Sequence, residues 1–200
     1  MIATGEESVS RRLEAARTDT WNVVTLAWSL LGSTGLIIGV GLLVSALILV
    51  RTKNRRLAAV PVLASILQEA IFLLAANIVD RPRPSVAHLD KAPPTASYPS
   101  GHVGAAMALY LTFGLLALYI RTAWVRWLTL AVCLAIPLLV TFGRLYRGMH
   151  HVTDVGAGLL NGITCAFLAH WWYRSTQQSR EPLVFASEAE LAEQRRPSNP

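Results

Sequence analysis

The chain reads PSGHVGAAMALYLTFGLLALYI at residues 99–120, a short polar turn followed by an apolar run without a charged residue. Runs of similar apolar character cover residues 33–50, 57–79, 104–120, 124–142 and 155–173. Each is long enough, or nearly so, to cross a hydrocarbon core of roughly 30 Å. They lack the polar face that recurs every three or four residues in helices of soluble proteins. The sequence therefore predicts an all-α fold, a polytopic transmembrane helix bundle with five spans.

The overall composition agrees with a membrane protein. Hydrophobic residues make up 53% of the chain and charged residues 15%, and the mean hydropathy is +0.42. These values exclude an ordinary soluble domain. The net charge of +6 does not indicate nucleic-acid binding, because the basic residues are dispersed among the connections between apolar runs.

The basic residues predict the orientation of the bundle. They follow alternate apolar runs, as Arg51, Lys53, Arg55 and Arg56, then Arg121 and Arg126, and finally Arg174 and Arg180. All of these connections lie on one side of a five-span bundle, and the positive-inside rule makes that side cytoplasmic. The opposite connections, residues 80–101 and 143–154, are therefore expected on the extracytoplasmic side, together with the N-terminus.

Those extracytoplasmic connections carry the polar residues that suit a phosphoryl-transfer site. Ser100 and Gly101 open a predicted helix, whose first turn presents free backbone N–H groups and a positive dipole end to an anion. Two guanidinium-bearing stretches, Arg81-Pro82-Arg83-Pro84 and Gly143-Arg144, could clamp a phosphate bidentately. The histidines His102 and His150 supply an acid and a nucleophile. Asp154 follows His150 by four residues, which places both side chains on one helix face.

These residues resemble the three signature blocks of the type 2 phosphatidic acid phosphatase and vanadium haloperoxidase superfamily. The blocks are Arg83-Pro84, Pro99-Ser100-Gly101-His102 and Arg144-x5-His150-x3-Asp154, and the similarity covers roughly residues 32–173. The connection from Leu89 to Pro94 and the run from Arg147 to His151 look like the bacterial branch of membrane-bound lipid phosphatases.

The resemblance implies a role for each residue. His150 would attack phosphorus and form a phosphohistidine, with Asp154 accepting a hydrogen bond from one of its ring nitrogens. His102 would protonate the leaving oxygen and then activate water. The phosphate oxygens would be held by Arg83, Arg144, Ser100 and the backbone at Gly101, while Arg81 would either touch phosphate or brace its own segment. No step requires a metal ion or any other cofactor.

Two positions depart from the family pattern. Ala76 stands where the first block begins with a lysine, so one phosphate-binding cation is absent, and Gly143 replaces the serine that often precedes Arg144. Within the second apolar run, Gln68 and Glu69 are expected to face the interior of the bundle, because an unpaired charge toward lipid is expensive.

The domain organisation follows from these boundaries. Residues 1–31 are expected to form an extracytoplasmic or interfacial segment, with one surface helix over residues 6–31. Residues 32–173 are expected to form the membrane phosphatase domain, and residues 174–200 a disordered cytoplasmic tail. An N-terminus on the outer side without a signal sequence is unusual, and it suggests a six-span family core that lacks its first helix.

The function expected is that of an integral-membrane phosphatase acting on a lipid phosphate or a prenyl pyrophosphate among membrane lipids. Three alternatives stay open: a lipid phosphotransferase, a non-catalytic lipid-phosphate binder or transporter, and a metal site at His150, His151 and Asp154. Nearby arginines favour an anion over a divalent cation. The fully membrane-embedded character disfavours vanadate-dependent halide oxidation. The sequence identifies neither the lipid nor the oligomeric state.

Overall fold

The computed structural model describes residues 2–92 and 95–178, and the regular structure within them is helical. The helices are α1 (Ile2–Ala15), α2 (Asp19–Leu30), α3 (Thr34–Thr52), α4 (Arg55–Ile78), α5 (Gly101–Ala117), α6 (Ala123–Tyr146) and α7 (Val152–Gln178). Helices α3 to α7 coincide with the five predicted apolar runs. Among the described residues, α3, α4, α6 and α7 are long and apolar enough to cross a membrane, and α5 is a shorter apolar helix. The prediction of an all-α membrane bundle is confirmed.

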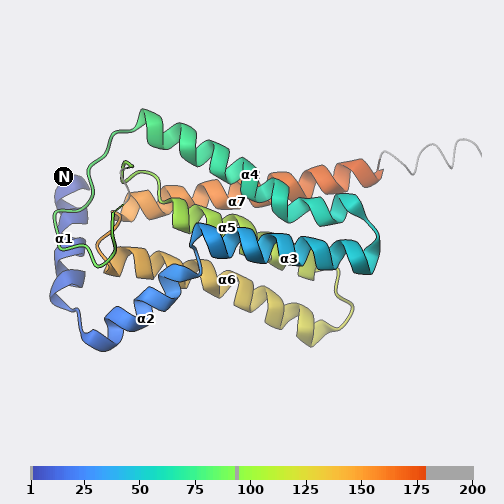
Figure 1. Ribbon diagram of the computed structural model, residues 1–200, viewed down its shortest axis with the longest axis horizontal. Coiled ribbons are helices and arrows are strands. Elements are labelled where there is room, and N and C mark those ends of the chain that lie inside the picture. The colour runs from blue at the N-terminus through green and yellow to red at the C-terminus, as the bar shows by residue number, and fades with distance from the viewer. Residues whose placement is uncertain (1, 93–94, 179–200) are drawn as a thin grey trace, which may run out of the picture.

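Helices α3 to α7 run side by side along the long axis of the molecule, and α1 lies across one end of them (Figure 1). That end, called here the α1 end, also holds the α4–α5 connection and the turn between α6 and α7. The α3–α4 and α5–α6 connections and the end of α7 lie at the opposite end, where Arg56 Nη1 donates to the Thr176 carbonyl over 3.1 Å. Of the basic residues predicted to share one face, those in the described part of the chain do so, at the end away from the motif residues, whereas Arg180 lies outside that part.

Helix α5 forms the centre of the bundle and packs against α3, α4, α6 and α7. Its contact with α7 is close because α7 carries glycine at two positions of that contact, Gly158 and Gly162. A Cβ atom added to Gly162 would lie 2.6 Å from the Gly104 carbonyl oxygen, and one added to Gly158 would lie 2.7 Å from the Ser100 carbonyl oxygen. Small residues four apart allow this approach of two backbones in a membrane. The start of α5 is consequently held against the first turns of α7.

The N-terminal segment differs from its prediction. Two helices replace the single surface helix expected over residues 6–31, and the chain between them turns at Arg17 and Thr18. Thr18 is extended, with φ −136° and ψ 159°, and its hydroxyl caps α2 by accepting from the backbone N–H of Trp21. The turn also lets the Arg17 guanidinium donate to the carbonyl oxygens of Tyr146 and Ala87. These contacts tie α1 to the end of the bundle.

Two further expectations meet the structure in part. Gln68 is buried in the bundle as expected. Glu69 was also expected to face the interior, but it is exposed, because successive residues of a helix point about 100° apart. At the C-terminus, α7 continues through residues 174–178, which were expected to belong to the tail. The rest of that predicted tail, residues 179–200, lies outside the described residues.

Candidate active site

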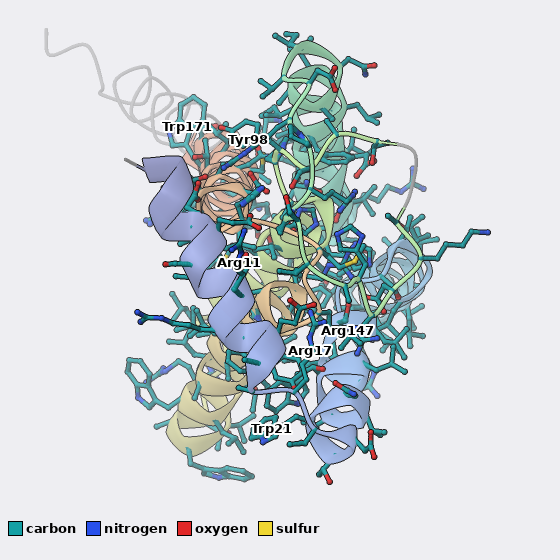
Figure 2. The ribbon with its side chains drawn as sticks, turned by 90° about the vertical axis from the view of Figure 1, so that its left-hand side faces the viewer. Arg11, Arg17, Trp21, Tyr98, Arg147 and Trp171 are labelled. Atoms are coloured by element: carbon teal, nitrogen blue, oxygen red, sulfur yellow. The ribbon has the colours of Figure 1, made fainter. Side chains whose placement is uncertain are left out.

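The residues singled out in the sequence gather at the α1 end, and they come from three stretches of sequence, residues 81–83, 100–102 and 144–154. Arg81 and Arg83 come from the α4–α5 connection, and Ser100, Gly101 and His102 from the start of α5. Arg144 lies in the last turn of α6, His150 in the turn that follows, and Asp154 in the first turn of α7. Figure 2 views this end directly and shows α1 crossing in front of it, with Arg11, Arg17 and Arg147 labelled.

The start of α5 presents unused hydrogen-bond donors. Ser100 is the N-cap residue, yet its hydroxyl makes no capping bond and is buried without a partner among the described residues. Its backbone N–H donates to the Asp154 carbonyl oxygen over 3.0 Å, which fixes the turn against α7. The first N–H groups of a helix have no partner within the helix. Together with the hydroxyl, they form a cradle for an anion.

His150 is held by a backbone carbonyl. Its Nδ1 lies 2.8 Å from the carbonyl oxygen of Ser97, and the ring is buried. Burial lowers the pKa of His150 well below its usual value, and the positive charges of Arg144 and Arg83 lower it further. The imidazole is therefore neutral, and the hydrogen-bond network assigns the proton to Nδ1, which donates to Ser97. This tautomer leaves a lone pair on Nε2.

Asp154 lies close to His150 but makes no hydrogen bond to it, which the resemblance implied. Its Oδ2 lies 3.9 Å from His150 Nδ1, beyond hydrogen-bond distance. The carboxylate is fully buried and accepts from three other donors: Arg81 Nη1 at 2.5 Å, Ser97 Oγ at 2.5 Å and the His151 backbone N–H at 2.8 Å. With its oxygens occupied in this way, Asp154 reaches His150 indirectly, because it holds the residue whose carbonyl binds the imidazole.

In the described part of the chain, Arg144 binds other side chains through one terminal nitrogen, Nη1. Its Nη1 donates to Asp90 Oδ2 over 2.8 Å and to the Ser29 hydroxyl over 2.9 Å. Asp90 also binds Arg147, whose Nε lies 2.8 Å from Oδ1. Burial raises the pKa of Asp90, but the hydrogen bond from Arg147 and the charge of Arg144 outweigh it and lower the pKa overall. The Nε atom of Arg144 is buried and has no partner among the described residues, which leaves it available to an anion.

The two arginines of the α4–α5 connection differ in their surroundings. Arg83 is half-buried and donates from Nη1 to the Met149 carbonyl oxygen over 2.7 Å, with no carboxylate bound to it in the described part of the chain. Arg81 has both terminal nitrogens engaged, Nη1 by Asp154 and Thr153 and Nη2 by Glu6. Of the two roles expected for Arg81, these contacts favour the bracing one.

Sequence reasoning missed Ser97, Asp90, Ser29 and Glu6. Ser97 precedes the second signature block by two residues, and nothing in the pattern distinguishes it from other hydroxyl residues. The other three residues lie far along the chain from the arginines that they bind. The separation is 115 residues for Ser29 and Arg144, 54 for Asp90 and Arg144, and 75 for Glu6 and Arg81. No local spacing could have indicated these contacts.

Two cavities flank the site. One, of about 500 Å³, lies between α3, α4 and α5, and its lining includes His102, Gly101, Phe72, Glu69 and Ile37. It is continued by a smaller apolar cavity of about 130 Å³ between α3 and α4, which shares Ile37 in its lining. The other, of about 640 Å³, lies between α1 and the α4–α5 connection, and its lining includes Arg11, Arg83 and His151.

Taken together, the groups at the α1 end suit an oxyanion of the size of phosphate. Guanidinium, hydroxyl and helix N–H donors gather at the same end as a neutral imidazole with a free nitrogen lone pair, and Arg144 and Arg83 lie near enough for their charges to act on it. Among residues 2–92 and 95–178, no group of three His, Cys, Asp or Glu side chains is arranged to hold a metal ion.

Comparison with known proteins finds a family model and solved structures that are similar to this chain. The family model of the PAP2 superfamily matches residues 56–178. A crystal structure described as the first transmembrane PAP2 type phosphatidylglycerolphosphate phosphatase from Bacillus subtilis superposes with a TM-score of 0.81 at 21% identity, over 87% of either chain. The structure of Aquifex aeolicus LpxE superposes with a TM-score of 0.64 at 21% identity, over 81% of this chain and 92% of that one. A comparison with curated protein sequences finds no significant match.

Proposed function

Because the chain belongs to the PAP2 superfamily, we propose that it is an integral-membrane phosphatase that hydrolyses a lipid phosphate or a prenyl pyrophosphate. The observation that carries this proposal is the neutral His150 imidazole, which is held through Nδ1 and lies near the guanidinium groups of Arg144 and Arg83. The descriptions of the two similar structures, a phosphatidylglycerolphosphate phosphatase and LpxE, support a lipid as the class of substrate.

The first chemical step is nucleophilic attack. The Nε2 lone pair of His150 attacks phosphorus in line with the leaving oxygen, and a phosphohistidine forms as the bond to the lipid oxygen breaks. Arg83, Arg144, the Ser100 hydroxyl and the backbone N–H at Gly101 bind the equatorial oxygens, whose charge must be stabilised through the transition state. His102 acts in its imidazolium form, which the negative charge of the bound substrate phosphate favours; it donates its proton to the departing oxygen, and the lipid alcohol leaves.

The second step returns the enzyme to its starting state. Water takes the place of the lipid alcohol, and His102, now deprotonated, accepts a proton from it as it attacks phosphorus. The N–P bond breaks, its electron pair returns to Nε2 of His150, and inorganic phosphate is released. Asp154 and Arg81 touch neither substrate nor phosphorus in this scheme. They keep Ser97, and hence His150, in place. No metal ion takes part.

The cavity of about 500 Å³ between α3, α4 and α5, called here the lateral cavity, suits the lipid part of the substrate. It joins His102 to the apolar space between α3 and α4, so a chain lying there would point its phosphate toward the start of α5. We place the reaction on the extracytoplasmic side, because the basic connections of the bundle lie at the other end.

The test is phosphate release by the purified protein in detergent with EDTA present. Phosphatidate, phosphatidylglycerol phosphate and undecaprenyl pyrophosphate are supplied in turn, and turnover of any of them supports the proposal. Transfer of the phosphoryl group to an added alcohol in preference to water would identify a phosphotransferase instead. Tight binding of all three without turnover would identify a binder, a result that the absence of the family lysine at Ala76 makes worth seeking. Turnover that EDTA abolishes would refute the metal-independent mechanism.

The side of the membrane needs a separate measurement. In sealed vesicles of known orientation, a substrate confined to one face should be hydrolysed only when that face carries the α1 end. Hydrolysis at the face that carries the basic connections would refute the assigned orientation.

A further inference from the structure

An acidic residue outside the family match is buried against the candidate site. Glu6 lies in the first half of α1, well before residues 56–178. It is 7% exposed, although α1 lies across the outer surface of the bundle end (Figure 2). Carboxylates are rarely buried unless they are paired, so the partners of Glu6 decide what it does.

Within the described part of the chain, the Glu6 carboxylate is bound by Arg81 and Thr153, both of which belong to the site region. Its Oε2 lies 2.6 Å from Arg81 Nη2, and its Oε1 accepts from both the backbone N–H and the hydroxyl of Thr153 over 2.7 Å. Burial raises the pKa of Glu6, but the hydrogen bonds from Thr153 and Arg81 outweigh it and lower the pKa overall. The residue is therefore an anion at neutral pH, at the first turn of α7, where negative charge is favoured.

Arg81 binds both Glu6 and the buried Asp154 and so links the two carboxylates. Its Nη2 is held by Glu6, while its Nη1 donates to Asp154 Oδ1 over 2.5 Å and to the Thr153 hydroxyl over 2.6 Å. A guanidinium is planar and rigid, so fixing one terminal nitrogen fixes the direction of the other. Without Glu6, the guanidinium would be free to turn away from Asp154 toward the cavity that it lines beside α1.

Asp154 in turn holds the residue that binds the imidazole. Its Oδ2 accepts from the Ser97 hydroxyl, and the Ser97 carbonyl oxygen lies 2.8 Å from His150 Nδ1. A continuous chain of hydrogen bonds therefore runs from α1 to the proposed nucleophile.

Helix α1 is docked firmly enough for this contact to be a constant feature. Besides Glu6, Glu14 accepts from the Ala87 backbone N–H over 2.7 Å, and Arg17 donates to the Ala87 carbonyl oxygen over 2.7 Å. Arg17 also donates twice to the Tyr146 carbonyl oxygen at the end of α6. The helix and the turn that follows it are thus bound to the α4–α5 connection and to the end of α6.

We infer that α1 is part of the active site and that Glu6 is a positioning residue, which sets the orientation of His150 through Arg81, Asp154 and Ser97. This inference rests on the proposed phosphatase function. Glu6 contacts neither the proposed phosphate site nor the lateral cavity, so its influence falls on the rate of the chemical step. A displacement of the reacting group by about 1 Å costs on the order of 100-fold in rate.

The experiment compares Glu6→Gln with Glu7→Gln, a matched control. Glu7 is the adjacent acid of the same helix, and its carboxylate lies 3.5 Å from the Ser85 backbone nitrogen and 3.7 Å from Arg11 Nε. We expect Glu6→Gln to lower kcat by roughly 10- to 100-fold with KM changed less than about 2-fold, and Glu7→Gln to behave as wild type. A rise in KM alone, or equal effects of the two variants, would overturn the inference.

A double-mutant cycle separates positioning from a general effect on folding. In the background of Arg81→Gln, Glu6→Gln should change kcat by less than about 2-fold, because the link that it acts through is already broken. Independent, multiplying effects would show that Glu6 acts by another route. Should Glu6→Gln fail to fold, Thr153→Ala weakens the same cluster from α7 and is expected to lower kcat in the same way, and wild-type kinetics there would count against the inference.

Binding of vanadate, measured by calorimetry, separates this inference from the proposed function. Vanadate mimics the transferring phosphoryl group and requires no turnover, so Glu6→Gln should weaken its binding by about 10-fold, while Glu7→Gln should not. If the two variants differ in this way but wild type hydrolyses no lipid phosphate, the phosphatase proposal is refuted and the positioning role of Glu6 stands. If wild type is active and Glu6→Gln binds vanadate and turns over substrate as wild type does, the positioning role is refuted and the phosphatase proposal stands.

Discussion

The contact between α5 and α7 should be intolerant of a single methyl group at Gly162. A Cβ atom there would lie 2.6 Å from the Gly104 carbonyl oxygen, 2.6 Å from Met107 Cβ and 2.8 Å from the Ala108 backbone nitrogen. Ordinary contacts begin at 3.4 Å, so the nearest atoms fall short by 0.8 Å. Two of the three are backbone atoms and cannot rotate away. In Gly162→Ala the two helices must therefore separate.

Gly156→Ala is the control for the magnitude. Gly156 lies on the same helix, and nothing is within 4 Å of the position that its Cβ would take. Both substitutions gain the same preference of alanine over glycine in a helix, about 1 kcal/mol. This gain cancels when the two variants are compared. The remaining difference in the free energy of unfolding is the cost of overpacking, about 1–3 kcal/mol, with Gly162→Ala the less stable.

The assay is reversible unfolding in mixed micelles followed by tryptophan fluorescence, together with phosphate release at a temperature where both variants are folded. Because α7 carries Asp154 and α5 carries His102, a separation of several tenths of an ångström should also lower kcat of Gly162→Ala, by roughly 10-fold or more. Equal stabilities of the two variants, within about 0.5 kcal/mol, would refute the close contact that the structure shows. A less stable Gly162→Ala with unchanged kcat would refute the link from this contact to the site.

The remaining predictions concern the site itself. His150→Ala should abolish phosphate release without disturbing membrane insertion, whereas His151→Ala should retain it; full activity of the first variant in the phosphate assay would remove the nucleophile assignment. Arg144→Lys should lower kcat/KM by on the order of 100-fold, because a single ammonium cannot bind Asp90 and a phosphate oxygen as a guanidinium does, and a loss below about 3-fold would contradict this. Burial, then the charges of Arg144 and other cations, holds the pKa of His150 well below 6.5 in the folded protein. As the pH falls from about 7 to 5, this histidine is therefore protonated in the unfolded chain before it is protonated in the folded protein. The melting temperature of wild type should fall relative to that of His150→Ala over that range. An equal difference between the two melting temperatures at all pH values would refute this prediction.

Local pattern was enough for the parts of this protein that depend on neighbouring residues. The five apolar runs became helices α3 to α7, because hydrocarbon length and the need to satisfy backbone hydrogen bonds inside each span leave few alternatives. Alternation of those spans brought Arg83, Ser100, Arg144 and His150 to one end of the bundle, as expected. The break at Arg17 and Thr18 escaped prediction, since the contacts that use it come from distant segments.

The amino-acid sequence by itself determined the membrane bundle, the end at which the polar groups meet and the residue types available there, because these follow from hydrophobic length and helical spacing. Only the tertiary structure decided which groups pair. Asp154 is four residues from His150 yet binds Arg81 and Ser97. Glu6 binds Arg81 from α1, the helix that lies across this end of the bundle. A buried carboxylate binds the best-placed donors that packing supplies, and for Asp154 two of the three donors lie tens of residues away along the chain.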